Sequence, residues 1–276
     1  MPDPDHDFFR FSVLEILRLA FYLYCMKLDI GQQEKVYGLI GRNISYSFSK
    51  NYFTEKFKGL GLENFSYENF DLEEITNIAE VLRTPKLSGL NVTIPYKEEV
   101  IPYLDFISKK AKEVGAVNTI RFTKEGKTKG YNTDEYGFRK ALAPLLQPHH
   151  TRALILGTGG ASKAVAYALN KLGIFYTFVS REDKPGMIDY NRINATTFDN
   201  YHIVINCTPL GTSPHIENYP SLPYEYFTER HIAFDLVYNP AETEFMRRAS
   251  QHGAITKNGY EMLVFQAEKA WKIWNR

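Results

Sequence analysis

"RALILGTGGASKAVAYALNKLG", residues 152–173, joins a short apolar strand directly to a helix through a glycine-rich turn. A dinucleotide-binding turn needs this order, because small residues let a pyrophosphate approach the backbone N–H groups at a helix N-terminus. Ser162 stands in place of the third glycine of GxGxxG, so the strand–turn–helix context carries the prediction. A tight turn that serves packing alone is the alternative. The candidate cofactor-binding residues of this turn are Gly157, Gly159, Gly160 and Ala161.

The chain around this stretch alternates strand and helix patterns from residue 35 onward, which predicts an α/β fold. Strands are expected at 35–41, at 64–71 and in the stretch that begins at residue 89. Helices are expected at 47–61, 72–83 and 135–147, with Asp71 as the N-cap of the second. Residues 116–134 are predicted to form a hairpin that turns near Gly126, because glycine tolerates the positive φ of a tight turn.

Composition limits the classes of function. The 276 residues include 33 Lys and Arg against 32 Asp and Glu, a near-neutral balance that gives no electrostatic basis for binding nucleic acid or an anionic membrane. Two cysteines, Cys25 and Cys207, cannot form a disulfide framework and are typical of a reducing compartment. The sequence therefore favours a cytoplasmic protein with a small-molecule partner, and leaves both a monomer and a homodimer open.

Residues 1–34 are predicted to be an extension of uncertain role. The apolar stretch at 11–26 is interrupted by Glu15 and Arg18, and it is shorter than the roughly 20 residues that span a bilayer. It is either an added packed helix or upstream translation before a natural start at Met26. No ligand pattern falls within it, so we expect it to be dispensable for chemistry.

The strand predicted before Ser180 ends in a charged loop, at the place where dinucleotide folds contact the adenosine ribose. Arg181 suits the 2′-phosphate of NADP, whereas Glu182 and Asp183 suit the free 2′-hydroxyl of NAD. Ser180, Arg181 and Lys184 are therefore candidate cofactor-binding residues. NADP is favoured, NAD stays open, and a solvated charged loop is the alternative to both.

Two further apolar strands, within 201–214 and 231–245, end in polar or Gly/Pro-rich residues. Ligands of open α/β sheets bind outside the carboxyl ends of the strands. We therefore expect Thr208, Pro209, Leu210 and Tyr238 to lie near the cofactor.

"GLNVTIPYKEE", residues 89–99, alternates apolar with polar residues as a half-buried strand does, and then meets a proline and a lysine. The pattern leaves open what Asn91, Thr93 and Lys97 face. Eight segments together supply an answer, because they occur in the order seen in shikimate dehydrogenases. They are SYSFS, NVTIPYK, GAVNT, YNTD, GTGGAS, INCTPLG, DLVYNP and NGYEMLVFQA.

The chain thus resembles the shikimate dehydrogenase family over about residues 36–276. The resemblance implies a two-domain fold, with a three-layer α/β substrate-binding domain and a Rossmann-like, doubly wound dinucleotide-binding domain. It implies an oxidoreductase that reversibly reduces 3-dehydroshikimate to shikimate with NADPH, a step of aromatic amino-acid (chorismate) biosynthesis. In that family, the residues that match Asn91, Thr93 and Lys97 face a polyhydroxylated ring.

A small hydroxylated carboxylate needs short side chains that donate and accept hydrogen bonds. By resemblance, Ser47 and Ser49 would bind the carboxylate. The remaining candidates would bind ring hydroxyls, although each alone could also be a cap or turn residue; they are Asn91, Thr93, Asn118 and Gln266. A site of this kind rejects an analogue that lacks a hydroxyl, because its polar groups would be left unpaired.

Lys97 and Asp134 are the candidate catalytic pair. Hydride addition to a ketone makes an alkoxide that needs a proton, which a lysine beside an aspartate can deliver as general acid and take back in reverse. Only the fold can bring the two together. Taken alone, Lys97 could be a residue of a first helical turn, and Asp134 could cap the helix that begins at Glu135.

By resemblance, Gly259 and Met262 would line the nicotinamide side of the cleft. Three residues depart from the family pattern: Tyr46, Lys50 and Glu261, the last of which places a charge where glycine is frequent and puts the affinity for cofactor or substrate in doubt. No metal site is expected, because the cysteines and histidines show no ligand spacing.

Since Gln266 must reach the substrate, the terminal helix is expected to return to the first domain. The predicted domains are then 35–135 plus 257–276 for substrate binding and catalysis, and 136–256 for NADP. Two alternatives to the leading function remain. One is a quinate/shikimate dehydrogenase that uses NAD, and the other is a non-catalytic shikimate- or nucleotide-binding module.

Overall fold

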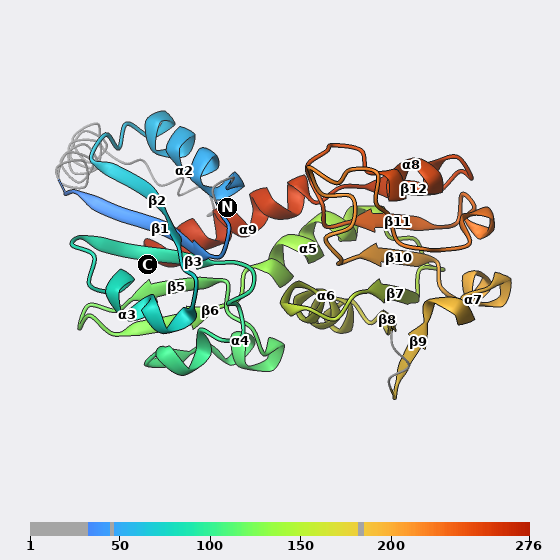
Figure 1. Cartoon of the computed structure of the whole chain (residues 1–276), viewed down its shortest axis with the longest axis horizontal. Coiled ribbons are helices and arrows are strands. Elements are labelled where there is room, and N and C mark those ends of the chain that lie inside the picture. The colour runs from blue at the N-terminus through green and yellow to red at the C-terminus, as the bar shows by residue number, and fades with distance from the viewer. Residues whose placement is uncertain (1–32, 45–46, 182–184) are drawn as a thin grey trace, which may run out of the picture.

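The computed structural model describes residues 33–44, 47–181 and 185–276. The predicted extension at 1–34 therefore lies almost wholly outside the described residues, as do Tyr46, Glu182, Asp183 and Lys184. The described chain forms two six-stranded sheets that follow one another along the long axis of the molecule (Figure 1). This is the α/β architecture with two sheets that the sequence predicts.

The first sheet has the strand order β2-β1-β3-β5-β6-β4. Strands β2, β1 and β3 are parallel, β5 is antiparallel to both β3 and β6, and β4 runs parallel to β6. The strands are β1 (Lys35–Gly41), β2 (Phe65–Asp71), β3 (Leu87–Val92), β4 (Phe106–Ile107), β5 (Thr119–Phe122) and β6 (Thr128–Tyr131). The helices of this part are α2 (Phe48–Gly59), α3 (Ile78–Val81) and α4 (Lys109–Val114).

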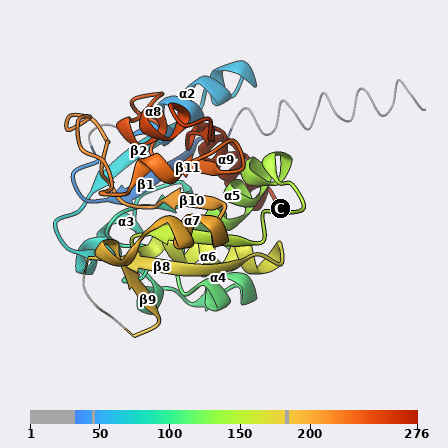
Figure 2. The same cartoon turned by 90° about the vertical axis from the view of Figure 1, so that its right-hand side faces the viewer.

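The second sheet has the order β12-β11-β10-β7-β8-β9, and all its strand pairs are parallel. Its order reverses between β7 and β10, which places a topological switch point at the carboxyl ends of these two strands. The strands are β7 (Arg152–Leu156), β8 (Phe175–Ser180), β9 (Met187–Asp189), β10 (Ile203–Asn206), β11 (Ile232–Asp235) and β12 (Ile255–Lys257). The helices are α6 (Gly160–Lys171), α7 (Ala195–Asn200) and α8 (Glu244–Ser250). Figure 2 views the molecule from the side of this sheet.

Helices α5 (Asp134–Leu142) and α9 (Tyr260–Trp274) run between the two sheets (Figure 1). Met262, near the start of α9, packs into the core of the second sheet, whereas Trp274, near its end, packs into the core of the first. The Trp274 indole N–H donates to the carbonyl of Ile120 at 3.0 Å, and a side chain at Gly89 would collide with the indole ring. The last helix of the chain therefore returns to the first sheet, as predicted.

Most predicted elements are confirmed, including the hairpin, whose Gly126 has φ +75°. The helix predicted at 72–83 is confirmed only in part: the helical segment is shorter and consists of a 3₁₀ turn (Ile75–Asn77) followed by the single turn of α3 (Ile78–Val81). Asp71 does not cap it, because its carboxylate accepts the backbone N–H groups of Asn43 and Ile44, at 2.8 and 3.1 Å. The loop after β1 thus uses the carboxylate that was expected to cap the helix.

Four histidines gather at the amino ends of β7, β10 and β11. The rings of His149, His150, His202 and His231 form a chain, with centroids 4.1 to 5.3 Å apart. Burial lowers the pKa of His150, His202 and His231, and the Nδ1 atom of His202 is buried without a hydrogen-bond partner. Burial therefore favours the neutral form of His150, His202 and His231.

We predict that acidification destabilises the protein through this cluster. Because these pKa values are lowered by folding, the unfolded chain binds more protons below about pH 6.5, so stability is present above that pH and is lost as pH falls towards the folded pKa values. Burial raises the pKa of Asp235 to about 6, so protonation of this carboxyl stabilises the folded protein as the pH falls. This contribution is the same in wild type and variant and does not affect their comparison. Thermal melts between pH 8 and pH 5 should show a smaller acid loss for His202→Phe than for wild type. Equal losses would contradict this account.

Candidate functional site

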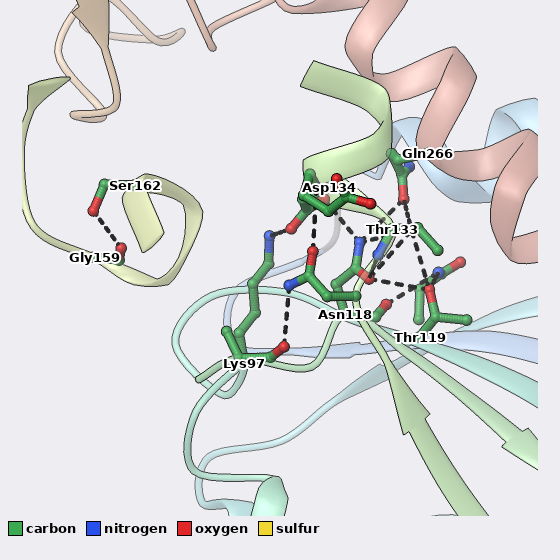
Figure 3. A network of polar contacts seen from close by, with 12 residues as sticks. Lys97, Asn118, Thr119, Thr133, Asp134, Gly159, Ser162 and Gln266 are labelled. Carbon is green, nitrogen blue, oxygen red and sulfur yellow. Dashed lines mark hydrogen bonds and ion pairs between the residues drawn. The ribbon is translucent and has the colours of Figure 1, made fainter. Parts of the chain in front are cut away.

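Lys97 and Asp134 meet between the two sheets. Lys97 lies in the turn after β3, Asp134 is the first residue of α5, and Lys97 Nζ is 2.7 Å from Asp134 Oδ2 although 37 residues separate them. The two side chains are only 15% and 7% exposed. Asp134 also lies at a helix N-terminus, where the helix dipole favours a negative charge. The fold thus brings the predicted catalytic pair together (Figure 3).

Asn118 connects this ion pair to the rest of the site. Its Nδ2 donates to Asp134 Oδ1 at 2.8 Å and to Thr133 Oγ1 at 3.0 Å, and its Oδ1 accepts the Thr133 backbone N–H at 2.7 Å. Gln266 reaches the same group from α9, with its Oε1 3.4 Å from both Asn118 Nδ2 and Thr133 Oγ1. Figure 3 shows these side chains converging beside Lys97.

Asn91 forms a second part of the network. Its Oδ1 accepts the Tyr67 hydroxyl at 2.8 Å, and its Nδ2 donates to the Asn118 carbonyl and to Thr119 Oγ1, at 3.2 and 3.3 Å. The Tyr67 hydroxyl also forms a hydrogen bond with the Ser49 side chain. Ser49, at the other end of the predicted substrate pocket, is therefore linked to Asn91.

Two other predicted substrate residues have structural partners of their own. Ser47 is the N-cap of α2, where its hydroxyl accepts the backbone N–H of Lys50 at 3.2 Å. The backbone N–H of Thr93 donates to the carbonyl of Ile40 at 2.8 Å, which holds the end of β3 against β1. Sequence reasoning named neither Tyr67 nor the two buried threonines, Thr119 and Thr133, although both threonines lie inside or beside quoted motifs.

The glycine turn lies at the carboxyl end of β7, at the switch point. Gly157 has φ +97°, which favours glycine, and a side chain there would be 3.1 Å from the Thr208 methyl group. Ser162 is fully buried, and its hydroxyl donates to the Gly159 carbonyl at 2.6 Å. The serine in place of a third glycine therefore braces the turn from inside.

The same turn lies against the catalytic lysine. A Cβ atom at Gly160 would be 3.4 Å from the Cβ of Lys97, and Glu98 forms an ion pair with Lys163 of α6. Gly159, by contrast, faces open space, since a Cβ atom there would meet nothing within 4 Å. The turn predicted to bind a cofactor and the predicted proton donor are thus neighbours, and Ala161 follows in the first turn of α6.

The remaining cofactor candidates are dispersed over the carboxyl ends of the second sheet. Thr208 and Leu210 follow β10, and Tyr238 follows β11 and packs its ring on Phe48 of α2, 5.5 Å between centroids. Gly259 precedes α9, and a side chain there would collide with the Leu236 carbonyl. Ser180 ends β8 and the exposed Arg181 follows it. Lys184 lies outside the described residues.

Met262 and Glu261 occupy different environments. Met262 is 5% exposed and belongs to the core of the second sheet. Glu261 is half exposed, and its carboxylate forms an ion pair with Lys257 at the end of β12. The charge that departs from the family pattern therefore has a local counter-ion.

No group of three or more His, Cys, Asp or Glu side chains in residues 33–44, 47–181 and 185–276 is arranged to hold a metal ion. Over the same ranges, none of the helices is both long and apolar enough to cross a membrane.

The fold and site define a two-domain α/β protein with a Rossmann-like second sheet, and the comparisons specify the family. The model for the shikimate dehydrogenase substrate binding domain matches residues 39–120. A shikimate dehydrogenase (NADP(+)) of Caldanaerobacter subterraneus subsp. tengcongensis is 36% identical over 267 residues, which cover 90% of this chain and 94% of that protein. The chain belongs to the shikimate dehydrogenase family.

Solved structures agree with this assignment. Shikimate 5-dehydrogenase from Thermus thermophilus, in complex with NADP(H) and shikimate, is 33% identical with a TM-score of 0.76, over 87% of this chain and 93% of that one. Quinate dehydrogenase from Corynebacterium glutamicum, in complex with NAD, is 26% identical with a TM-score of 0.77, over 87% and 93% of the two chains.

We predict that Gly137→Ala disturbs the contact between α5 and α9. A methyl group at Gly137 would collide with the Met262 carbonyl and lie 3.2 Å from Gln266 Cβ. Overpacking of this kind costs about 1–3 kcal/mol, which chemical denaturation can measure. Gly59→Ala is the matched control, because a Cβ at the end of α2 meets nothing within 4 Å and should leave stability nearly unchanged. A neutral Gly137→Ala would show that the helices are not held this closely.

Proposed function

We propose that the chain catalyses the reversible NADPH-dependent reduction of 3-dehydroshikimate to shikimate, a step of chorismate and aromatic amino-acid biosynthesis. The observation that carries the proposal is the Lys97–Asp134 ion pair, which lies against the glycine turn of the second sheet. The relatives support it, since the Caldanaerobacter protein is named an NADP(+) shikimate dehydrogenase and the Thermus structure contains both ligands.

The glycine turn fits a dinucleotide. Gly157 at φ +97° turns the chain sharply, Gly159 leaves open space, and no side chain caps the N-terminus of α6. When bound, the nicotinamide supplies the hydride. The residues that would hold the cofactor are Gly157, Gly159, Gly160, Ala161, Ser180, Arg181, Lys184, Thr208, Leu210, Tyr238, Gly259 and Met262. Of these, the buried Met262 would act through packing.

Lys97 would hold and move the proton. Its Nζ atom is 2.7 Å from the Asp134 carboxylate, which fixes the direction of the Lys97 side chain in a nearly closed environment. Lys97 would donate a proton to the oxygen of the ketone as it becomes a hydroxyl, and would take it back in the oxidation. Asp134 has a second oxygen bound to Asn118, so it aligns the lysine with the hydroxyl-binding residues.

The substrate would lie along the polar network. Asn118, Gln266, Asn91 and Thr93 would bind ring hydroxyls, and Ser47 and Ser49 the carboxylate. The hydrogen bond between Ser49 and Tyr67 connects the carboxylate end to Asn91 at the hydroxyl end. A carboxylate without the ring hydroxyls would leave these buried groups unpaired and would bind weakly.

We also retain the predicted domains, 35–135 with 257–276 for the substrate and 136–256 for NADP. The predicted location is the cytoplasm. The predicted oligomeric state is a monomer or a homodimer, and no nucleic-acid partner is expected. The quinate/shikimate alternative with NAD is not favoured, because the more similar relatives are NADP(+) enzymes by name. A non-catalytic binding module is disfavoured by the intact Lys97–Asp134 pair.

Initial rates with shikimate and quinate, each with NADP and with NAD, test the function and its cofactor together. We predict the highest kcat/KM for shikimate with NADP. Arg181→Ala should raise KM for NADP much more than KM for NAD, because only NADP has a 2′-phosphate for the guanidinium to bind. A wild type that prefers quinate with NAD would contradict the proposal, and equal effects of Arg181→Ala on both cofactors would make Arg181 an ordinary surface residue.

We predict that Lys97→Ala lowers kcat by about 10²-fold or more, the range for a positioned acid–base group, with a much smaller change in the KM for shikimate. Removing the ammonium leaves a buried carboxylate without its cation, so rates should be compared below the melting transition. Lys109→Ala is the control, since that lysine is 91% exposed. Near-normal kcat in Lys97→Ala would remove Lys97 from the mechanism.

A further inference from the structure

Asp235 is a fully buried carboxylate for which the proposed function has no use. It ends β11 directly opposite Asn206 at the end of β10. Its Oδ1 accepts the Asn206 side-chain amide and the Val237 backbone N–H, both at 3.0 Å, and its Oδ2 accepts the Thr243 hydroxyl at 2.6 Å. One side chain thus connects the turns that follow two neighbouring strands.

Asn206 passes this connection to the cofactor side. Its Oδ1 accepts the backbone N–H of Thr208 at 3.0 Å and the Thr208 hydroxyl at 2.6 Å. Its Nδ2 donates to the Leu210 carbonyl at 3.3 Å as well as to Asp235. The side-chain amide of Asn206 therefore holds the turn of residues 206–211, which includes the cofactor candidates Thr208 and Leu210.

The direction of the amide follows from its neighbours. An ionised carboxylate only accepts hydrogen bonds, so Asp235 requires Nδ2 on its side and thereby directs Oδ1 to Thr208. The reverse orientation would place an N–H₂ group against the Thr208 N–H, donor against donor. Asp235 therefore sets the orientation that the turn needs.

Asp235 also holds the opposite side of the switch point. The Val237 backbone, whose N–H it accepts, in turn accepts the N–H of Gly259 through its carbonyl at 3.0 Å. On the other side, Thr208 lies next to Gly157 of the glycine turn. The chain of hydrogen bonds from Thr243 to Thr208 thus joins the segments around the expected nicotinamide end of the cofactor.

The carboxylate is costly to bury. Desolvation raises the pKa of Asp235 to about 6, against the lowering effect of its three hydrogen bonds. Within the described ranges, the ion pairs do not include Asp235, so no cation offsets this cost. A group that weakens the fold at neutral pH and yet organises a turn is better explained by the turn than by stability.

We propose that Asp235 is a positioning residue that, through Asn206, holds the turn of residues 206–211 in the shape that receives the nicotinamide end of the cofactor. This inference rests on the proposed function. It requires a hydrogen-bond acceptor at position 235 rather than a charge. Because the turn of residues 206–211 contains cofactor candidates and no substrate candidate, loss of Asp235 should weaken binding of NADP and not of shikimate.

Asp235→Ala and Asp235→Asn test the inference. For each variant, kcat and the KM values for shikimate and for NADP are measured by initial rates, and the Kd for NADP is measured by calorimetry. Asp235→Ala should raise KM and Kd for NADP about tenfold or more and leave KM for shikimate within about twofold. Asp235→Asn keeps an oxygen for Asn206 and Val237 and can donate to Thr243, so both values should stay near wild type. Its melting temperature should not fall at pH 8, because a buried charge is removed.

Thr243→Val keeps the inference testable if Asp235→Ala does not fold. The valine is close in shape and removes only the hydroxyl donor to Asp235 and the N-cap of α8, so KM for NADP should rise severalfold while Thr243→Ser stays normal.

Variants that melt earlier but keep KM and Kd for NADP within twofold would overturn the inference, as would equal losses for shikimate. A wild type that binds NADP but does not oxidise shikimate would overturn the proposed function, and the Kd values would still decide the inference.

Discussion

A carboxylate nearly excluded from water is the constraint on which the site depends. Asp134 is 7% exposed, and moving such a charge out of water costs several kcal/mol unless partners replace the lost hydration. Lys97 supplies the counter-charge to one oxygen and Asn118 an N–H to the other. These three residues come from the turn after β3, the position just before β5 and the start of α5. The pair therefore depends on the fold, which brings these three segments together.

The arrangement of the helices follows from the same requirement. Asp134 begins α5, which runs towards the second sheet, and Gln266 enters the network from α9, which returns from that sheet. Gly137 allows the two helices to touch, and Trp274 fastens the end of α9 to β5. Because both helices pack between the two sheets, the glycine turn of the second sheet lies in contact with Lys97 of the first. The packing of α5 on α9 thus fixes how the glycine turn lies relative to the Lys97–Asp134 pair.

The strand–turn–helix stretch predicted the second sheet well, because a buried parallel strand, a glycine turn and an amphipathic helix each leave a local pattern. Lys97 and Asp134 were paired by resemblance, since no local signal joins residues so far apart. Thr119 and Thr133 were missed because a single threonine beside a strand looks like a solvent-facing residue, whereas here both are fully buried. The helix predicted at 72–83 is shorter than expected, and Asp71 does not cap it, because its carboxylate accepts N–H groups of the loop after β1, a long-range contact that no window of sequence contains.

A double-mutant cycle on Lys97→Ala and Asp134→Asn tests most directly the claim that the pair acts as one proton-donating unit. If it does, each single variant removes the aligned ammonium, so the double variant should have nearly the kcat of Lys97→Ala alone, with shikimate and NADP saturating. The coupling energy would then be close to the whole effect of Asp134→Asn. Independent, multiplicative losses of kcat in the double variant would contradict the claim and would assign the two residues to separate tasks.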